Sequence, residues 1–212
     1  MGWVCQGAGV AVTPMFPLGT VLVPGMVLPL HVFEPRYRQM VDDCMAADRT
    51  FGVVLIERGS EVGGGDVRTD IGTRAGIVRA EQQPDGRWGL IAVGLRRIRV
   101  DRWLPDAPYP RAEVSDWPDE GDGAVPETAV PLLRRAAALA RELGMDAAPI
   151  DLELSDDPVA AGYQAIVAAP LGPADRQSLL VAPTLADRWT LLDALLADQI
   201  EILEAELAHG GS

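Results

Sequence analysis

The first half of the chain alternates short apolar runs with turn residues, and this pattern predicts β-strands around one helix. Phe16 to Val23 and Phe51 to Glu57 are apolar runs rich in β-branched residues and bounded by glycine and proline. Such runs are typical of buried strands. Two later runs, Gly76 to Gln83 and Arg87 to Val100, flank a Pro84-Asp85-Gly86 turn. They predict a β-hairpin.

The second arm of this hairpin changes the phase of its alternation. Before the change, the residues expected to face the core are Ile91, Val93 and Leu95. After it, Ile98 and Val100 should face inward, and Arg97, Arg99 and Asp101 should face outward. A change of phase within one strand indicates an extra residue. We therefore expect a β-bulge near Arg96.

Between the first two strands lies a predicted helix whose start and apolar face are both visible. Glu34-Pro35 begins it, because proline suits the first helical turn, where its missing N–H is not needed. Apolar side chains then recur at helical spacing and form one stripe. They are Tyr37, Met40, Val41, Cys44 and Met45. Glu34 should lie near the positive end of the helix dipole and pair with Arg38.

The second half of the chain has helical spacing and helix-terminating residues. Pro126 to Leu143 is followed by Gly144, a suitable C-terminal stop. Ser155 to Pro158 forms an N-cap cluster before the helical run Val159 to Ala169. Gly172-Pro173 then begins a short helix that reaches Leu180.

A long final helix follows a capping box at Thr184 to Asp187. Its apolar residues recur every three or four positions, while most of its acidic residues face the other side. The stripe consists of Leu185, Trp189, Leu192, Leu196, Ile200, Leu203 and Leu207. We expect this stripe to be the packing face of the helices, with dimerisation through it as an alternative.

Charge divides the chain near the same point as the periodicity. Up to Asp106 there are 12 acidic and 12 basic residues, whereas Ala107 onward has 19 acidic residues and six arginines. After a predicted strand at Arg111 to Trp117, a proline-rich acidic stretch joins the two halves. The expected organisation is an N-terminal extension at 1–13, a β lobe at 14–118, a linker at 119–125 and a helical lobe at 126–212.

Composition excludes many kinds of chemistry. The net charge of −13 repels a phosphate backbone, so a nucleic-acid partner is not expected. All 18 basic residues are arginine. Without lysine there can be no Walker A loop, Schiff base or serine–lysine pair. Any histidine-dependent nucleophile or metal site would have to use His31 or His209.

The remaining composition favours a globular cytoplasmic protein. Hydrophobic residues make up 48% of the chain, too many for disorder, and no run of about 18 apolar residues predicts a membrane span. Cys5 and Cys44 are far apart and form no CxxC motif, so we expect reduced thiols and no metal site. The N-terminal residues lack the basic and apolar regions of a signal peptide.

Four segments, in order, resemble one known family. They are FPLGTVLVPGMVLPLHVFEPRYR (Phe16 to Arg38), FGVVLI (Phe51 to Ile56), GTRAGIVRAEQQPDGRWGLIAVGLRRIRV (Gly72 to Val100) and APLGPADRQSLLVAPTLADRWTLLDALL (Ala169 to Leu196). Together they resemble the N-terminal, substrate-binding domain of the Lon ATP-dependent protease, over about residues 14–205. Arg176 departs from the lysine expected in many relatives, as an all-arginine composition would require.

The resemblance implies an α+β fold: a PUA-like β pseudo-barrel lobe with one packed helix, then a helical lobe ending in a long helix. It also implies non-catalytic recognition of unfolded or client proteins, with a protease as a further partner and no cofactor. The protease's ATPase and Ser-Lys peptidase both require lysine, so we expect a stand-alone recognition module, monomeric or weakly dimeric. Clients should bind between the lobes or on an apolar surface of the β lobe.

The start of the predicted helix is the candidate partner-binding site. It comprises Phe33, Glu34, Arg36, Tyr37 and Arg38. Aromatic and arginine side chains are enriched at interface hot spots. The alternative is structural, because the same block begins a helix and Tyr37 lies on its apolar stripe.

Two neighbouring features invite a functional interpretation but favour a structural one. Gly63-Gly64-Gly65-Asp66 has no phosphate-binding spacing and should be a mobile hairpin loop. His31 has no nucleophile nearby, so we expect a half-buried, hydrogen-bonded histidine rather than a general base.

Two alternative functions stay open. An RNA-binding PUA-like module would use the basic cluster Arg96, Arg97, Arg99 and Arg102. A carboxylate-dependent hydrolase would use the pairs Asp42-Asp43 or Asp156-Asp157. Adjacent residues at helical positions point in different directions, which disfavours the second alternative.

Overall fold

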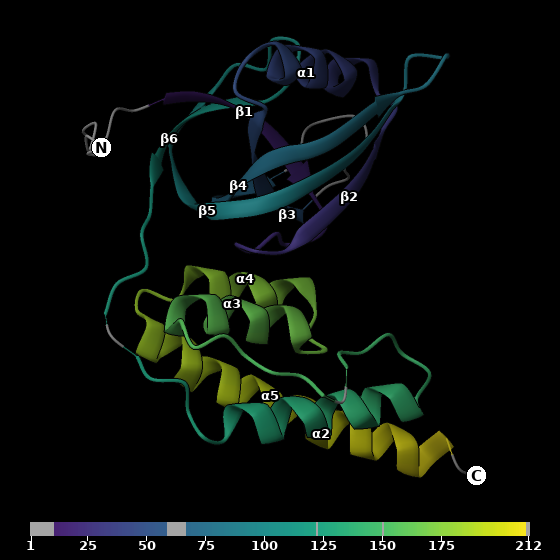
Figure 1. The fold of residues 1–212 in the computed structure, drawn as a ribbon, viewed down its shortest axis with the longest axis vertical. Coiled ribbons are helices and arrows are strands. Elements are labelled where there is room, and N and C mark those ends of the chain that lie inside the picture. Colours follow the sequence, from purple (N-terminus) through teal and green to yellow (C-terminus); the bar gives the residue numbers. More distant parts are fainter. Residues whose placement is uncertain (1–10, 59–66, 122, 150, 211–212) are drawn as a thin grey trace. The chain divides into compact units, whose positions relative to one another are not determined.

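The computed structural model describes residues 11–58, 67–121, 123–149 and 151–210 (Figure 1). The chain forms two compact units, Met1–Pro118 and Asp119–Ser212. The first has strands and one helix and the second has helices, which confirms the predicted α+β class. Cys5 and the Gly63–Asp66 loop lie outside the described residues. Within the described ranges, no helix combines the length and the apolar character needed to cross a membrane.

The first unit contains a six-stranded mixed sheet that closes on itself. Its strands are β1 (Ala11–Leu18), β2 (Val27–Val32), β3 (Thr50–Arg58), β4 (Val67–Gln82), β5 (Trp88–Leu104) and β6 (Arg111–Asp116). They lie in the order β2-β5-β4-β3-β1-β6, and a further β5–β6 pairing closes the ring. β1 and β3 run parallel, and the other pairings are antiparallel. Among the described strands, β2 pairs with β5 alone.

The first apolar run is a strand over only part of its predicted length. β1 ends at Leu18, so the expectation of a strand through Val23 is wrong. Val21, Leu22 and Val23 are nonetheless buried, in a loop. The Thr73 hydroxyl donates a 2.6 Å hydrogen bond to the Leu22 carbonyl. A side chain thus satisfies backbone that the sheet leaves unpaired.

The β4–β5 hairpin contains the predicted bulge. Arg74 lies opposite Arg96 and Ala75 lies opposite Gly94, so Leu95 falls between two paired positions. One extra residue on β5 therefore shifts the alternation there, as the change of phase predicts.

The residues that face the core before this bulge differ from the prediction. Leu90 and Ala92 are buried and Val93 is half-buried, whereas Ile91 and Leu95 are exposed. Toward the bulge this inner side is crowded, and the residues there are the small Ala92 and Gly94. A Cβ atom at Gly94 would lie 2.2 Å from the Val23 carbonyl oxygen.

Beyond the bulge, Ile98 and Val100 are buried and Arg99 is exposed, as predicted. Arg97, expected to face outward, is only 2% exposed. Its guanidinium carbon lies 4.3 Å from the centre of the Trp117 ring, and its Nη2 donates to the Pro118 carbonyl at 3.1 Å. The alternation along β5 could not reveal this burial, because the ring that covers the Arg97 guanidinium belongs to Trp117, near the end of the first unit.

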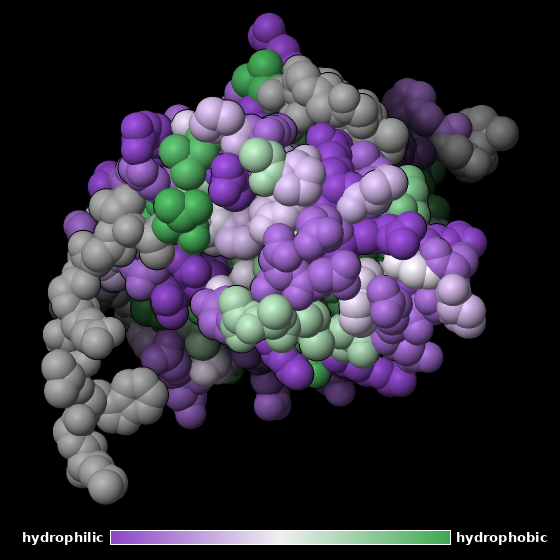
Figure 2. Space-filling model, turned by 90° about the horizontal axis from the view of Figure 1, so that it is seen from above, coloured by the Kyte–Doolittle hydropathy of each residue, from purple (hydrophilic) through white to green (hydrophobic). Residues whose placement is uncertain are grey.

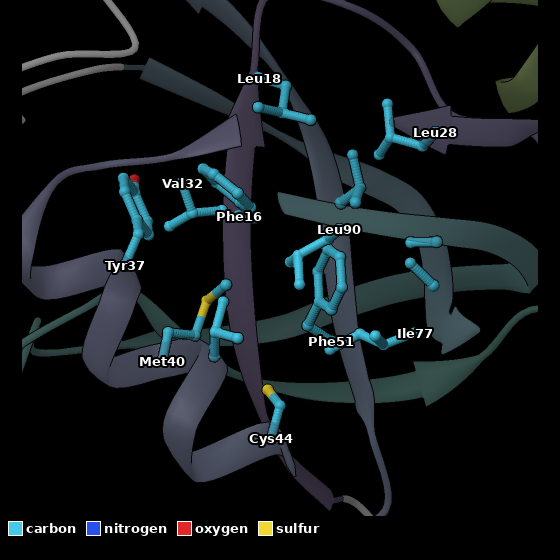
Figure 3. Close-up of a cluster of buried hydrophobic side chains, with 14 of the residues drawn as sticks. Phe16, Leu18, Leu28, Val32, Tyr37, Met40, Cys44, Phe51, Ile77 and Leu90 are labelled. Carbon is cyan, nitrogen blue, oxygen red and sulfur yellow. The ribbon is translucent and has the colours of Figure 1, made fainter. Parts of the chain in front are cut away.

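The single helix of the first unit, α1 (Pro35–Ala46), packs on the sheet through the predicted stripe. Tyr37, Met40, Val41 and Cys44 are buried, and Met45 packs at the edge of the same cluster. Figure 3 shows Tyr37, Met40 and Cys44 on the side of α1 that faces Phe16 of β1 and Phe51 of β3.

The second unit contains α2 (Ala129–Glu142), α3 (Pro158–Ala168), α4 (Pro173–Val181) and α5 (Leu185–Gly210). α2 begins at Ala129 rather than at the predicted Pro126, whereas several other helix ends match the sequence signals. Gly144 follows α2 with a φ of +76°, and the Asp157 carboxylate accepts the Ala160 N–H at the start of α3. Before α5, the Thr184 hydroxyl accepts the Asp187 N–H at 3.1 Å and donates to the Asp187 carboxylate at 2.7 Å.

The predicted stripe of α5 is the packing face of this unit. Six of its residues are buried and Leu207 is half-buried. The stripe omits Arg188, which is fully buried. Arg188 forms an ion pair with Asp119, and its guanidinium carbon lies 4.4 Å from the centre of the Tyr163 ring. Asp119, assigned to the linker from the sequence, therefore belongs to the second unit.

Candidate functional site

The candidate residues surround the turn between β2 and α1. Glu34 is the N-cap residue, with extended backbone (φ −65°, ψ 134°), and Pro35 occupies the first turn of the helix. The Glu34 side chain does not cap the helix. It accepts a 3.1 Å hydrogen bond from Arg36 Nε. The predicted side-chain pair with Arg38 is wrong, because the Glu34 carboxylate bonds to Arg36 instead. The Arg38 N–H donates to the Glu34 backbone carbonyl at 2.9 Å.

Tyr37 is a core residue. It is 3% exposed, and its ring stacks on Phe16 with 4.3 Å between ring centres. The Arg36 guanidinium carbon lies 4.5 Å from the centre of the Tyr37 ring. Arg36 is therefore held by a cation–π contact and an ion pair, which agrees with the structural interpretation of these two residues.

Phe33 is the exposed aromatic residue of the group. Its side chain is 51% exposed, and the His31 ring centre lies 6.4 Å from its own. His31 is exposed rather than half-buried. The expectation of a half-buried histidine is wrong because alternate residues of β2 face outward, and His31 is one of them.

Beside Phe33 lies a hollow of about 210 Å³. Most of its wall is apolar and comes from the ends of β1 and β2 and the start of α1. The lining residues are Phe16, Leu18, Pro29, Leu30, His31, Val32, Phe33, Glu34 and Tyr37. Figure 3 shows four of them, Phe16, Leu18, Val32 and Tyr37, close together at one end of the core. The hollow is smaller than the roughly 300–1,000 Å³ of small-molecule sites, and suits one side chain.

The structure brings together only part of the predicted site. Phe33, Glu34 and Tyr37 line the hollow, and Arg36 covers Tyr37. Arg38 does not line it. A Cβ atom at Gly86 would lie 2.2 Å from Arg38 Nη2, so this guanidinium lies against the turn between β4 and β5.

The sequence did not identify the β1 and β2 residues of the wall as part of a site. The sequence predicted Phe16 and Leu18 only as buried strand residues. It placed Leu30 and Val32 in the segment that leads into the helix. Pro29 was a usable signal, because proline inside a strand marks a sheet edge, where its missing donor costs no ladder hydrogen bond.

The basic cluster on β5 is largely neutralised by acidic neighbours. Arg96 pairs with Asp116 at 2.8 Å, and Arg102 pairs with Glu113. The hydrogen bond to Arg102 lowers the pKa of Glu113. Because Arg97 is also buried, no free arginine stripe faces a nucleic acid in the described part of β5, and the RNA-binding alternative loses its support.

The adjacent acidic residues Asp42 and Asp43 on α1 connect this helix to other parts of the first unit. Asp42 accepts from Trp88 Nε1 at 3.2 Å, and Asp43 accepts from the Tyr109 hydroxyl at 2.7 Å. Burial and this hydrogen bond raise the pKa of Tyr109 to about 12.

The carboxylate pairs do not support the hydrolase alternative. Asp42 and Asp43 contact different partners, and Asp157 caps α3, so neither pair has the converging geometry of a hydrolase. The described residues hold no group of three or more potential metal ligands.

Comparison with known proteins gives one consistent family. The family model described as the ATP-dependent protease La (LON) substrate-binding domain matches residues 12–198. The chain is 24% identical over 204 residues to Lon protease 1 of Herpetosiphon aurantiacus and 29% identical over 203 residues to its Lon protease 2. These alignments cover 92% and 91% of this chain but 25% and 24% of the proteases. The chain thus spans about a quarter of these relatives.

Solved structures are similar over nearly the whole chain. A Lon N-terminal domain protein from Xanthomonas campestris has a TM-score of 0.64 and 31% identity, covering 89% of this chain and 98% of that one. The N-terminal domain of the Mycobacterium avium complex Lon protease has a TM-score of 0.58 and 20% identity, covering 89% and 99%. The second likeness is one of fold.

Proposed function

Since the chain belongs to the family of Lon substrate-binding domains, we propose that its first unit recognises unfolded segments of protein substrates without acting on them chemically. The observation that carries this proposal is the exposed Phe33 beside an apolar hollow sized for one side chain. A segment of unfolded protein offers apolar side chains that a folded protein keeps inside. A protease that receives the bound substrate is the partner this role implies.

Apolar burial supplies the affinity in this proposal. On binding, Phe33 and one client side chain would both leave water, at roughly 25 cal/mol for each Å² of apolar surface buried. Association costs consume much of this gain, so a single hollow gives weak binding. Weak, sequence-tolerant contact suits recognition of many different unfolded chains.

The test is a titration of fluorescently labelled, reduced and carboxymethylated α-lactalbumin, which cannot refold. The wild-type chain should bind it and should not bind folded α-lactalbumin. Phe33→Ala should weaken binding by about 1–2 kcal/mol, or roughly 5- to 30-fold, with little change in melting temperature. Leu95→Ala is the matched control, because Leu95 is similarly exposed at 49% but does not line the hollow.

Equal losses in the two variants would show unspecific apolar adhesion and contradict the assigned site. A wild-type chain that binds neither form of α-lactalbumin would contradict the proposed function itself.

A further inference from the structure

One edge of strand β2, called the bare edge below, pairs with no strand among the described residues. In the described part of the molecule its only partner is β5, through the register Val27–Val93 to Val32–Trp88. Val27, Pro29 and His31 are exposed, and β2 contains no aspartate, glutamate, lysine or arginine. Charged residues and proline commonly protect sheet edges from pairing with another chain, and of the two β2 itself contains only Pro29.

The hydrogen bonding next to β2 shows which backbone groups face outward. The Gly94 N–H donates to the Met26 carbonyl at 2.9 Å, so the Met26 carbonyl points toward β5. Backbone groups alternate between the two edges of a strand. Leu28, Leu30 and Val32 therefore bond to β5, and Val27, Pro29 and His31 turn their backbone groups to the bare edge. Pro29 fits this position because it has no N–H to give.

The hollow beside Phe33 extends along this edge. Residues Pro29 to Glu34 form one part of its wall, and Phe16 and Leu18 of β1 form another. In a strand added beside β2, alternate side chains would point to the inner face of the sheet. That face is where Leu28 and Val32 are buried, so an inward side chain would enter the hollow.

We propose that an unfolded client segment binds by adding a strand to the bare edge of β2, with one apolar side chain in the hollow. This inference rests on the proposed function and names its binding mode. Backbone pairing explains sequence tolerance, because every residue except proline offers the same donor and acceptor. The edge presents three acceptors, the carbonyls of Val27, Pro29 and His31, but only two donors.

Strand addition predicts that replacing Pro29 strengthens client binding. Pro29→Ala restores the missing donor opposite a client carbonyl. One added hydrogen bond should tighten client binding about two- to tenfold. A site that binds through side chains alone would lose affinity or stay unchanged, because alanine removes part of the apolar wall.

The decisive probe is a capped heptapeptide of alternating threonine and valine with phenylalanine at its centre. Two derivatives carry N-methyl groups on one or the other alternate set of amides. In an added strand only one set points toward β2, so one derivative should lose more than about tenfold in affinity while the other stays within about twofold. Each derivative is the control for the other, since both carry N-methyl groups.

The outcomes separate this inference from the proposed function. If unfolded α-lactalbumin binds and Phe33→Ala weakens it, but both N-methyl sets act equally or the heptapeptide fails to bind, strand addition is overturned and the proposed function stands. Pro29→Ala that leaves affinity unchanged or lower also overturns it. If Pro29→Ala instead makes the chain dimerise in sedimentation without tightening the peptide, the edge pairs with a second copy, and the client mode is wrong.

Discussion

Cys44 shows how burial changes the chemistry of a single residue. It lies on the inner side of α1, 2% exposed, and its thiol donates to the Thr50 carbonyl at 3.3 Å. Burial, together with the nearby Asp48 and Asp43 carboxylates, raises the pKa of the Cys44 thiol from 9.0 to about 12. The thiolate is the reactive form, so Cys44 should not react with thiol reagents while the protein is folded.

This shift predicts a loss of stability in alkaline solution. An unfolded chain releases the Cys44 proton near pH 9, whereas the folded chain keeps it until about pH 12. Stability is therefore fully present below pH 9 and falls as the pH rises between the two values. The loss from this group should approach roughly 1.4 kcal/mol per pH unit.

Urea unfolding of the wild type and Cys44→Ala between pH 9 and pH 10 is the measurement. The raised pKa of Tyr109 acts in the same direction, mainly above its ordinary value of 10.0. Tyr109 is present in both proteins, so the difference between their pH dependences reports the thiol. Cys44→Ala should give the flatter dependence. Parallel slopes in the two proteins would show that the thiol ionises alike in both states.

Helix α5 contains one buried and one exposed large apolar residue that can be compared as a matched pair. Leu196 is fully buried and Ile202 is 52% exposed on the same helix. Leu196→Ala should destabilise the protein by about 2–5 kcal/mol, because it loses the transfer energy of the side chain and leaves a cavity. Ile202→Ala should cost less than about 0.5 kcal/mol. Chemical denaturation measures both.

Dimerisation through α5 makes a different prediction for the same pair. If the stripe were an interface between copies, Leu196→Ala would change the sedimentation coefficient and would make stability depend on protein concentration. If only Leu196→Ala lowers the free energy of unfolding, and the loss does not depend on protein concentration, the stripe packs within the unit.

At the scale of the whole molecule, the junction between the units is short. The Pro118 carbonyl accepts from Arg97 of the first unit, and the next residue, Asp119, pairs with Arg188 of the second. Two consecutive residues are thus fixed to different units. Tyr163 strengthens the second attachment by donating its hydroxyl to the Asp119 carboxylate at 2.7 Å.

Removing the Asp119 carboxylate should therefore destabilise one unit only. Asp119→Ala leaves the buried Arg188 without its counter-ion, a change that typically costs about 3–5 kcal/mol. Amide hydrogen exchange of α5 should become about a hundredfold faster or more, while exchange in β4 and β5 stays unchanged. Asp198→Ala, an exposed acidic residue on the same helix, is the control. Equal acceleration in both units would show that they unfold together.

Periodicity and local chemistry determined a large part of this fold. The stripes of α1 and α5, the cap at Asp157, the stop at Gly144 and the bulge beside Arg96 were all predicted. Each depends on residues close together in sequence, whose geometry the backbone repeat dictates. The ordered family segments added the α+β class and the substrate-binding family.

Only the tertiary structure decided the contacts between distant segments. Arg97 and Arg188 are buried because Trp117 and Asp119, far away in sequence, cover or neutralise them. The inward face of β5 depends on the Val23 loop packed against Gly94. The hollow likewise needs β1, β2 and α1 together. A periodic pattern states which side of an element is apolar, but partner chemistry and packing space decide which residues are buried there and which remain available to a ligand.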